Sequence, residues 1–316
     1  MIALHRENVR VFAPATVANV GCGFDIFGFA LNEPGDEVRL QVTDNPGVSI
    51  AKISGDGGLL PYQAQHNTAG RALQSMLDTL QADFGLEVEI RKKMPIGSGL
   101  GSSAASSVAA VFALNALLKE PLSNERLLPF ALEGERIAAG GALHPDNVAA
   151  CLYGGFVLIR DKSTYDIINI PTPPDLYCAV VHPRIEIITS EARKMLKNQL
   201  PLQQAITQWA NVAGMVIALM TSDYDLLRRS LHDEVAEPDR AVLIPHYEAL
   251  KKAALQKGAS GFGISGSGPS VFAFCKGLPL AKKVGAAIRS VFQENEIGNE
   301  VYISDINKQG PKIISG

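Results

Sequence analysis

The sequence lacks the features that mark several broad classes of protein. It has one Trp, and no run of basic residues exceeds two or three, so nothing in it indicates nucleic-acid binding. Residues 1–8 contain no apolar core, and we expect no signal peptide there. Residues 198–222 carry no charge but include four Gln and two Asn, which makes them too polar to cross a bilayer. We expect a buried helix in that stretch and no membrane partner.

Cysteine is also scarce. The four cysteines are widely spaced, with no C-x-x-C pair and no His at metal-ligand spacing; they are Cys22, Cys151, Cys178 and Cys275. This spacing predicts reduced, partly buried thiols in a cytoplasmic protein rather than a disulfide framework or a zinc site. The chain has 316 residues, a net charge of −3 and 47% hydrophobic residues, which allows two globular domains and a substantial core.

In contrast to cysteine, glycine is abundant, and one glycine-rich stretch predicts a ligand site. Residues 95–105 have glycines at alternate positions, Gly97, Gly99 and Gly101, which permit positive φ angles and a close approach of the backbone to a ligand. Residues 86–90 before them alternate like a half-buried strand, and residues 104–118 after them are small, apolar and uncharged, as in a buried helix. A flexible linker would not join such elements. The stretch therefore predicts a phosphate site at a helix N-terminus.

The same loop is not a nucleotide loop of the Walker A type, because no Lys follows its glycines. Ser102 and Ser103 are natural helix caps at this position. A second glycine cluster, residues 261–266, satisfies G-x-G-x-x-G, but a strand-like segment follows it and no acidic residue lies near 281–290. We therefore reject a dinucleotide fingerprint there and expect a tight turn that lets the backbone pass close to another segment.

Helices and strands mix without steady alternation, which predicts the α+β class. Expected strands are 9–12, 38–42, 48–53, 86–90, 155–160, 177–182, 271–275 and 301–304, with a turn-rich segment at 13–28. After residues 67–68 we expect an amphipathic helix with Leu73, Met76, Leu77 and Leu80 on one face, and a short helix is expected after the loop 144–147. The other expected helices are about 104–118, 124–139, 190–199, 203–221, 224–234, 246–257 and 279–295. We divide the chain into domains at 1–165 and 166–316, close to a proline cluster at 171–174.

Three separated motifs together resemble the GHMP kinases, the family that joins galactokinases, homoserine kinases, mevalonate kinases and phosphomevalonate kinases. Its central signature, a Pro and a short spacer before Gly-Leu-Gly-Ser-Ser-Ala, matches residues 95–105. Its third motif is similar to Gly261-Phe-Gly-Ile-Ser-Gly-Ser-Gly-Pro269, and its first to Pro14-Ala-Thr-Val-Ala-Asn19 with Gly23-Phe-Asp25. The resemblance spans residues 9 to about 275.

Within the family the match is closest to the members that act on L-homoserine, also through residues 144–147, 189–193 and 237–240. The resemblance implies an N-terminal α/β domain like the second domain of ribosomal protein S5 and a ferredoxin-like α+β domain, with the site between them. It implies Mg²⁺-dependent transfer of phosphate from ATP to the side-chain hydroxyl of L-homoserine, on the route to threonine. It also implies a homodimer.

The resemblance assigns residues to ATP and the metal ion. The ATP-binding set is Pro95, Ile96, Gly97, Ser98, Gly99, Leu100, Gly101, Ser102, Ser103, Ala104 and Ala105, with Asn67 near the adenine and the third loop residues Gly263, Ser265, Gly266, Ser267 and Gly268 close by. Lys92 or Lys93 is a weaker adenine candidate. Ser103 and Glu135 match the family's Mg²⁺ ligands, hydroxyl and carboxylate oxygens that this ion prefers. Glu133 remains an alternative to Glu135, because the spacing to His144 leaves both possible.

The implied substrate is a zwitterion with a hydroxyl group. The residues matched to it are Asn19, Asp25, His144, Asn147, Thr189, Arg193 and Arg240. Arginines suit the carboxylate and Asp25 the ammonium group. Asn147 stands where mevalonate kinase and galactokinase have a catalytic Asp, which implies transfer without a strong enzymatic base. The adjacent Asp146 is expected to point elsewhere.

Two other functions stay open from the sequence. One is another small-alcohol kinase of the mevalonate type, although mevalonate offers no ammonium group to Asp25. The other is a non-catalytic nucleotide sensor on the same fold. The presence of Ser103, Glu135 and Asn147 argues against the sensor.

Overall fold

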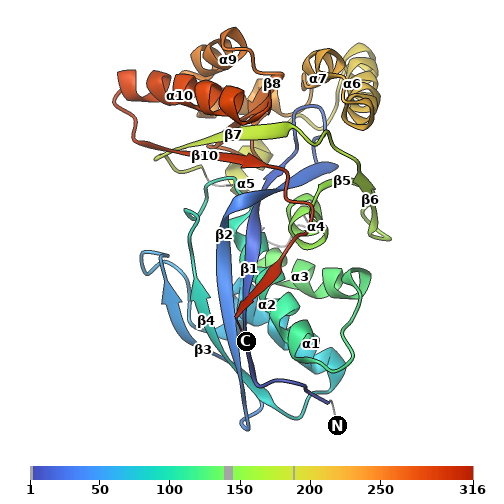
Figure 1. The fold of residues 1–316 in the computed structure, drawn as a ribbon, viewed down its shortest axis with the longest axis vertical. Coiled ribbons are helices and arrows are strands. Elements are labelled where there is room, and N and C mark those ends of the chain that lie inside the picture. The colour runs from blue at the N-terminus through green and yellow to red at the C-terminus, as the bar shows by residue number, and fades with distance from the viewer. Residues whose placement is uncertain (1–2, 139–144, 188, 316) are drawn as a thin grey trace.

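The protein is described from a computed structural model that covers residues 3–138, 145–187 and 189–315. Two sheets organise these residues, a larger one in the lower half of Figure 1 and a smaller one above it. The larger sheet has seven strands in the order β11-β1-β2-β4-β3, with β5 paired to β2 and β6 to β5. These strands are β1 (Asn8–Ala18), β2 (Phe27–Thr43), β3 (Gly47–Ser54), β4 (Gly85–Arg91), β5 (Phe156–Asp161), β6 (Asp166–Ile170) and β11 (Lys312–Ser315).

Alternating sequences explain the register of the larger sheet. On β4, Val88 and Ile90 are buried and lie opposite Leu40 and Val38 of β2, so one face of both strands is apolar. Three helices lie against the sheet, α1 (Thr68–Leu80), α2 (Ser102–Leu117) and α4 (Pro145–Tyr153), and α3 (Asn124–Ala138) packs on these helices. The 3₁₀ turn η1 (Ala64–His66) precedes α1.

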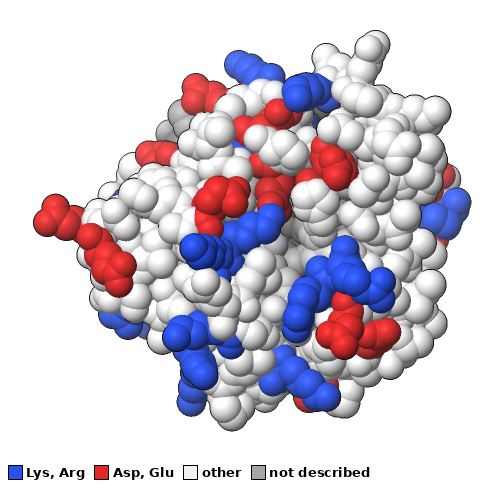
Figure 2. All heavy atoms as spheres, turned by 90° about the horizontal axis from the view of Figure 1, so that it is seen from above, with Lys and Arg blue, Asp and Glu red and all other residues white. Residues whose placement is uncertain are grey.

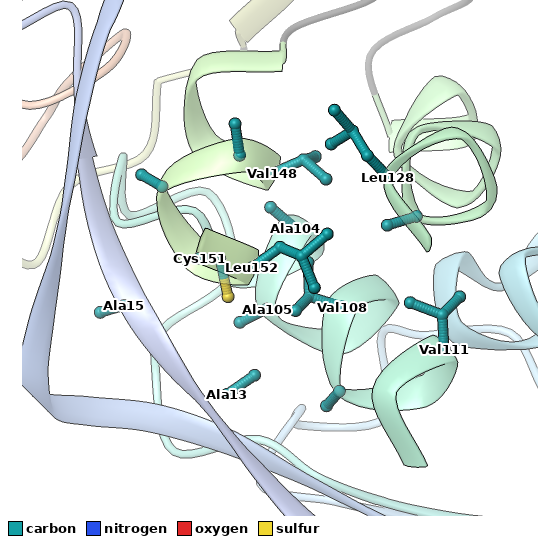
Figure 3. Close-up of a cluster of buried hydrophobic side chains, with 14 of the residues drawn as sticks. Ala13, Ala15, Ala104, Ala105, Val108, Val111, Leu128, Val148, Cys151 and Leu152 are labelled. Atoms are coloured by element: carbon teal, nitrogen blue, oxygen red, sulfur yellow. The ribbon is translucent and has the colours of Figure 1, made fainter. Parts of the chain in front are cut away.

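The helix α2 is the centre of this core. Thirteen of its sixteen residues are buried, which confirms the prediction made from its small apolar sequence. Small side chains let neighbouring elements approach closely. Figure 3 shows Ala104, Ala105 and Val108 of α2 near Val148, Cys151 and Leu152 of α4, with Ala13 and Ala15 along β1. The phosphate loop at the start of α2 is therefore attached to the most tightly enclosed helix of the fold.

The smaller sheet is antiparallel, in the order β10-β7-β9-β8. Its strands are β7 (Leu176–Pro183), β8 (Gly261–Ile264), β9 (Val271–Lys276) and β10 (Asn299–Asp305). Numbered along the chain this order is 4-1-3-2, that of a ferredoxin-like sheet. Its helical segments are α5 (Thr189–Lys194), α6 (Leu202–Thr221), α7 (Tyr224–Ser230), α8 (Glu237–Arg240), η2 (Ala241–Leu243), α9 (Tyr247–Gln256) and α10 (Leu278–Glu294). The predicted α+β class is confirmed.

Three details differ from the sequence prediction. The segment expected to be turn-rich at 13–28 continues β1 to Ala18 and begins β2 at Phe27, because the backbones of these two strands pair in the sheet. The charge-free helix at 198–222 forms as α6, but only Met215, Ala218 and Leu219 of it are buried, so the prediction of a buried helix is wrong. The division at 165/166 stays a prediction, and β6 and β11 beyond it pair with the larger sheet.

The charge distribution on the surface and the state of the cysteines are those of an ordinary globular protein. Basic and acidic side chains are interspersed on the face of Figure 2 rather than separated by sign. Among the described residues, no helix is long and apolar enough to cross a membrane. All four cysteines are free and buried, as their spacing predicts.

Candidate active site

The loop between β4 and α2 has the conformation that its glycines predict. Gly97, Gly99 and Gly101 have φ angles of 69°, 75° and 66°. Gly101 itself precedes α2 as the capping residue, so the helix begins at Ser102 and neither serine caps it. A Cβ atom on Gly101 would lie 2.0 Å from Thr16 Oγ1, which explains why only glycine fits. The first N–H groups of α2 therefore lie next to this loop, where the helix dipole favours an anion.

The late glycine loop packs directly against the phosphate loop. Ser265 Oγ donates a hydrogen bond to the Gly99 carbonyl at 2.6 Å, and Ser270 Oγ donates one to the Ser98 carbonyl at 2.6 Å. A strand, β9, follows this loop. The predicted tight turn with a close backbone neighbour is therefore confirmed, and the dinucleotide reading is excluded by its context. These bonds join the two sheets at one place.

A cavity of about 430 Å³ lies where the two loops meet. It is lined by Asn19, Asp25, Leu60, Thr68, Lys92, Ile96, Gly97, Ser98, Gly99, Gly101, Ser102, Ser103, Ser106, Glu135, Ala138, Asp146, Asn147, Glu186, Ile187, Arg193, Arg240, Gly266 and Ser267. These residues lie in loops and helices next to both sheets and span most of the chain. A groove of about 560 Å³ beside α8 and α9 contains none of the predicted site residues, so the chemistry belongs to the smaller cavity.

One carboxylate in the cavity is suited to a metal ion. Ser103 Oγ donates to Glu135 Oε1 at 2.9 Å, while Glu135 Oε2 is buried without a hydrogen-bond partner among the described residues. Burial raises the pKa of Glu135 to about 7. The alternative, Glu133, instead forms ion pairs with Arg71 and Arg136 nearer the surface. The structure thus brings Glu135 to Ser103, and the unpartnered oxygen fits a cation.

The buried side chain of Lys92 stabilises the end of the phosphate loop from inside the protein. Lys92 contacts Asp36, and its Nζ donates to the Ser102 carbonyl and to Ser106 Oγ at 2.7 Å each. Asp36 also accepts from the backbone N–H of Lys93 at 2.8 Å. Lys92 therefore uses its donors inside the protein. Sequence reasoning missed Asp36, because an acidic residue on a strand carries no signal of burial.

The other end of the cavity carries the two predicted arginines. Arg193 donates to both carboxylate oxygens of Asp25, at 3.1 and 2.7 Å, and Lys162 donates to the same carboxylate at 2.9 Å. Burial tends to raise the pKa of Asp25, but these cations lower it to about 2. Arg193 and Arg240 both lie over the ring of Phe24, at 5.7 and 5.3 Å from its centroid.

Arg240 differs from Arg193 in its partners. It is only 4% exposed, its Nη1 donates to the Gly266 carbonyl at 3.1 Å, and no carboxylate forms an ion pair with it among the described residues. Burial lowers its pKa. Asp25, Asp233 and Asp146 stabilise the charge from a distance, and an anionic ligand in the cavity could pair with the guanidinium directly.

Two asparagines connect the motifs. Asn19 Nδ2 donates to the Gly266 carbonyl at 2.8 Å, and its Oδ1 accepts from the N–H of Asp25 at 2.9 Å. Asn147 Oδ1 accepts from Thr16 Oγ1 at 2.7 Å. The neighbouring Asp146 also lines the cavity, so the expectation that it points elsewhere is wrong. At the start of α4, consecutive residues can both reach the site because the cavity covers the helix end.

Of the remaining predicted residues, Asn67 has its side chain bonded within the protein. Asn67 caps α1, accepting from the N–H groups of Ala69 and Gly70, and it donates to Pro61, so its polar atoms are used within the protein. Its contact with adenine stays a prediction. His144 and the expected helix end near 139 lie outside the described residues, as does the side chain of Thr189, the first residue of α5.

Comparisons with known proteins identify the family of this chain. The family model described as "GHMP kinases N terminal domain" matches residues 67–155, and "GHMP kinases C terminal" matches 215–294. A homoserine kinase of Chlorobium phaeobacteroides is 46% identical over 98% of this chain and the whole of that protein. The crystal structure of homoserine kinase from Cytophaga hutchinsonii is 49% identical, covers 99% of both chains and superposes with a TM-score of 0.96.

A third relative shows how widely the fold extends. The structure of L. major mevalonate kinase with R-mevalonate covers 97% of this chain with a TM-score of 0.73, but at 21% identity it shows the fold alone. The chain belongs to the GHMP kinase family, and within it to the homoserine kinases. The predicted family, fold and kinase class are confirmed.

Proposed function

We propose that this chain transfers the γ-phosphoryl group of ATP to the side-chain hydroxyl of L-homoserine and releases O-phospho-L-homoserine and ADP. The observation that carries the proposal is the pairing of a phosphate loop with a buried arginine, Arg240, that has no ionic partner among the described residues. The loop suits a nucleotide and the arginine suits an amino-acid carboxylate. Both line one cavity.

The phosphates of ATP would bind along residues 97–103. The backbone there turns through three positive φ angles, and the first N–H groups of α2 point to the same region. Ser98 adds a buried hydroxyl that has no partner among the described residues. Such an arrangement neutralises phosphate charge with fixed donors, which is the main requirement of phosphoryl transfer.

Ser103 and Glu135 would hold Mg²⁺, with the remaining ligands supplied by phosphate oxygens and water. The unpartnered Oε2 atom of Glu135 supports this assignment. When bound, the ion supplies positive charge next to the transferring phosphoryl group. Ionised Glu135 is needed for this, and a cation would lower its raised pKa.

The substrate would lie across the Phe24 side of the cavity. Its carboxylate would pair with Arg240 and Arg193, and its ammonium group with Asp25, whose carboxylate already accepts from Arg193 and Lys162. Because Asp25 and Arg193 neutralise each other, the zwitterion can insert between them without a net change of charge. A zwitterion also separates this substrate from mevalonate, which has no ammonium group.

Asn147 would hold the reacting hydroxyl. Its oxygen already accepts a bond from Thr16, which leaves its amide NH₂ group to donate to the substrate oxygen. An amide cannot take up a proton at neutral pH. The hydroxyl oxygen therefore attacks the γ-phosphorus while its proton passes to an oxygen of the transferring phosphoryl group, and ADP leaves with the electrons of the broken P–O bond.

We also propose that the protein works as a homodimer in the cytoplasm. The family resemblance supports the dimer, and four buried free thiols suit a reducing compartment.

The direct test is a coupled assay of ADP release with MgATP. L-Homoserine is compared with D-homoserine, L-threonine, L-serine and mevalonate. Turnover strongly selective for L-homoserine supports the proposal. Turnover with mevalonate instead favours the alternative small-alcohol kinase, and ATP binding without turnover on any substrate favours the nucleotide sensor.

A further inference from the structure

The two charged groups of the proposed substrate would contact segments that lie far apart in the sequence. Asp25 belongs to the loop 19–26 between β1 and β2, and Arg240 is the last residue of α8. In a zwitterionic amino acid, the ammonium group and the carboxylate are attached to the same carbon atom. The two segments must therefore be held at a fixed separation if both groups are to bind at once.

The loop between β1 and β2 has a backbone conformation that needs support from outside. Asn19, Val20 and Asp25 have φ angles of 69°, 36° and 62°, in the left-handed region that residues other than glycine rarely adopt. A β-branched residue such as Val20 is especially disfavoured there. Such conformations persist only where surrounding groups hold them, and they gather at functional sites. The position of Asp25 therefore depends on contacts that the loop makes with other segments.

One side chain of α6 contacts this loop and the segment before α8 at the same time. Gln208 Nε2 donates to the Cys22 carbonyl at 2.7 Å and to Asp233 Oδ1 at 2.8 Å. Gln208 Oε1 accepts from the N–H of Glu234 at 2.8 Å. In Figure 1 the loop, drawn in blue, reaches the helices α6 and α7. These partners require an amide, because two acceptors face its NH₂ group and a donor faces its oxygen.

Asp233 extends this connection to α8. Its carboxylate is buried and also accepts from the backbone N–H groups of residues 235, 236 and 237, at 3.0, 2.9 and 2.8 Å. The N–H of Arg240 in turn donates to the Ala236 carbonyl at 2.9 Å. Because α8 has only four residues, its direction follows from the groups that are bonded at its start. Gln208 therefore helps to orient the segment that carries Arg240.

Gln208 acts on the site from outside it. Among the described residues, neither Gln208 nor Asp233 lines the cavity, so both affect a ligand only through other residues. The loop and the segment before α8 also meet directly, because a Cβ on Gly21 would lie 2.2 Å from the Leu231 carbonyl oxygen. This backbone contact sets the shortest separation of the two segments, and the bonds of Gln208 limit the longest.

We propose that Gln208 is a positioning residue for the amino-acid part of the site, because it ties the loop that carries Asp25 to the segment that carries Arg240. The inference rests on the proposed binding of L-homoserine at these two residues. The phosphate loop is held by separate bonds from Ser265 and Ser270, so ATP affinity should not depend on Gln208.

The isosteric variant Gln208→Glu tests the proposal. It keeps the size of the side chain but replaces the NH₂ donor with an oxygen that faces two acceptors, the Cys22 carbonyl and Asp233. We expect the KM for L-homoserine to rise about 10- to 100-fold, with the KM for MgATP unchanged and kcat reduced less than KM is raised. Steady-state kinetics with each substrate varied measures this. Thermal denaturation shows whether the variant is folded, and Gln208→Met, which removes the same donors without adding charge, replaces it if it is not.

Two further variants on the same helix are matched controls. Gln204→Glu makes the same change at an exposed position and should leave both KM values unchanged. Asn211→Asp makes the corresponding change at a side chain that donates to the His232 carbonyl at 2.9 Å, which belongs to only one of the two segments. This variant should raise the KM for L-homoserine less than about threefold.

Other results would overturn the inference. An unchanged KM for L-homoserine in Gln208→Glu, with turnover in the wild type, would show that the two segments keep their separation without the amide. Equal rises in KM for both substrates, or an equal effect of Asn211→Asp, would show that α6 acts on the whole fold instead. Absence of L-homoserine turnover in the wild type would overturn the proposed function, and this inference with it.

Discussion

At the scale of single residues, Arg240 shows how a buried cation with no direct ion pair among the described residues can be reserved for a ligand. Replacement by Lys keeps the charge but loses the forked donors that match a carboxylate. We expect Arg240→Lys to raise the KM for L-homoserine by about 10- to 100-fold, with ATP affinity unchanged. Steady-state kinetics with each substrate varied measures this. Arg184→Lys, at an exposed arginine, is the control, and equal losses for both substrates would contradict the assignment.

The raised pKa of Glu135 predicts that its replacement stabilises the folded protein but abolishes activity. Its pKa rises from 4.5 in the unfolded chain to about 7 in the fold, so the folded protein holds more protons between those values. The free energy of unfolding should therefore fall as pH rises through this window, by on the order of 3 kcal/mol. Glu135→Gln removes that loss. Without metal or nucleotide at pH 8, the variant should melt above the wild type while phosphoryl transfer is lost.

A variant that melts below the wild type at pH 8, and equally at pH 5, would contradict this account of Glu135. Calorimetry at both pH values, with ADP release measured in parallel, provides the comparison.

The adjacent residues Asp146 and Asn147 test whether a base is needed. We expect Asn147→Ala to lose activity, because nothing then holds the hydroxyl, and Asp146→Asn to keep most of kcat. Burial, with the charge of Asp25, raises the pKa of Asp146 to about 6, so a role as base would appear as a limb near that pH in the kcat profile. If Asp146→Asn lost several orders of magnitude and that limb, with ATP binding intact, transfer without a base would be wrong.

At the scale of elements, close contacts around Gly101 fix the backbone conformation between the phosphate loop and α2. Gly101→Ala forces a side chain against Thr16 and Asn147 at a positive φ, and we expect it to cost about 2–4 kcal/mol and to abolish ATP binding. Gly97→Ala is a matched control with a similar φ but nothing within 4 Å of the added atom, and it should cost only about 1 kcal/mol. Chemical denaturation and nucleotide titration compare them, and similar losses in both variants would refute the steric explanation.

The elements also show what the sequence predicted and what it did not. The alternation in β4 and the small residues of α2 identified a half-buried strand and a buried helix, because both patterns report burial directly. The same reasoning misjudged α6. Its lack of charge suggested burial, but only three of its 20 residues are buried, because a lack of charge does not by itself report burial.

At the scale of the whole molecule, the site depends on contacts between distant segments. Thr16, Asn147 and Gly101 meet from three motifs, and the loop at Ser265 closes them from the other sheet. The phosphate loop could be predicted from the residues without the family resemblance, because its glycines lie in one short stretch of sequence. The substrate residues are far apart in the sequence, and only the family resemblance predicted that they form one site. The supports, such as Asp36 under Lys92, could not be predicted, because their burial arises from the tertiary fold.

The central claim is that one cavity holds ATP at the glycine loop and a zwitterionic amino acid at the arginines. The most direct test is the rate of ADP release with MgATP and L-homoserine, for the wild type and Arg240→Lys, with mevalonate as the comparison substrate. The account predicts turnover with L-homoserine alone, and a higher KM for it in the variant. Turnover with mevalonate, or an unchanged KM in Arg240→Lys, would contradict it.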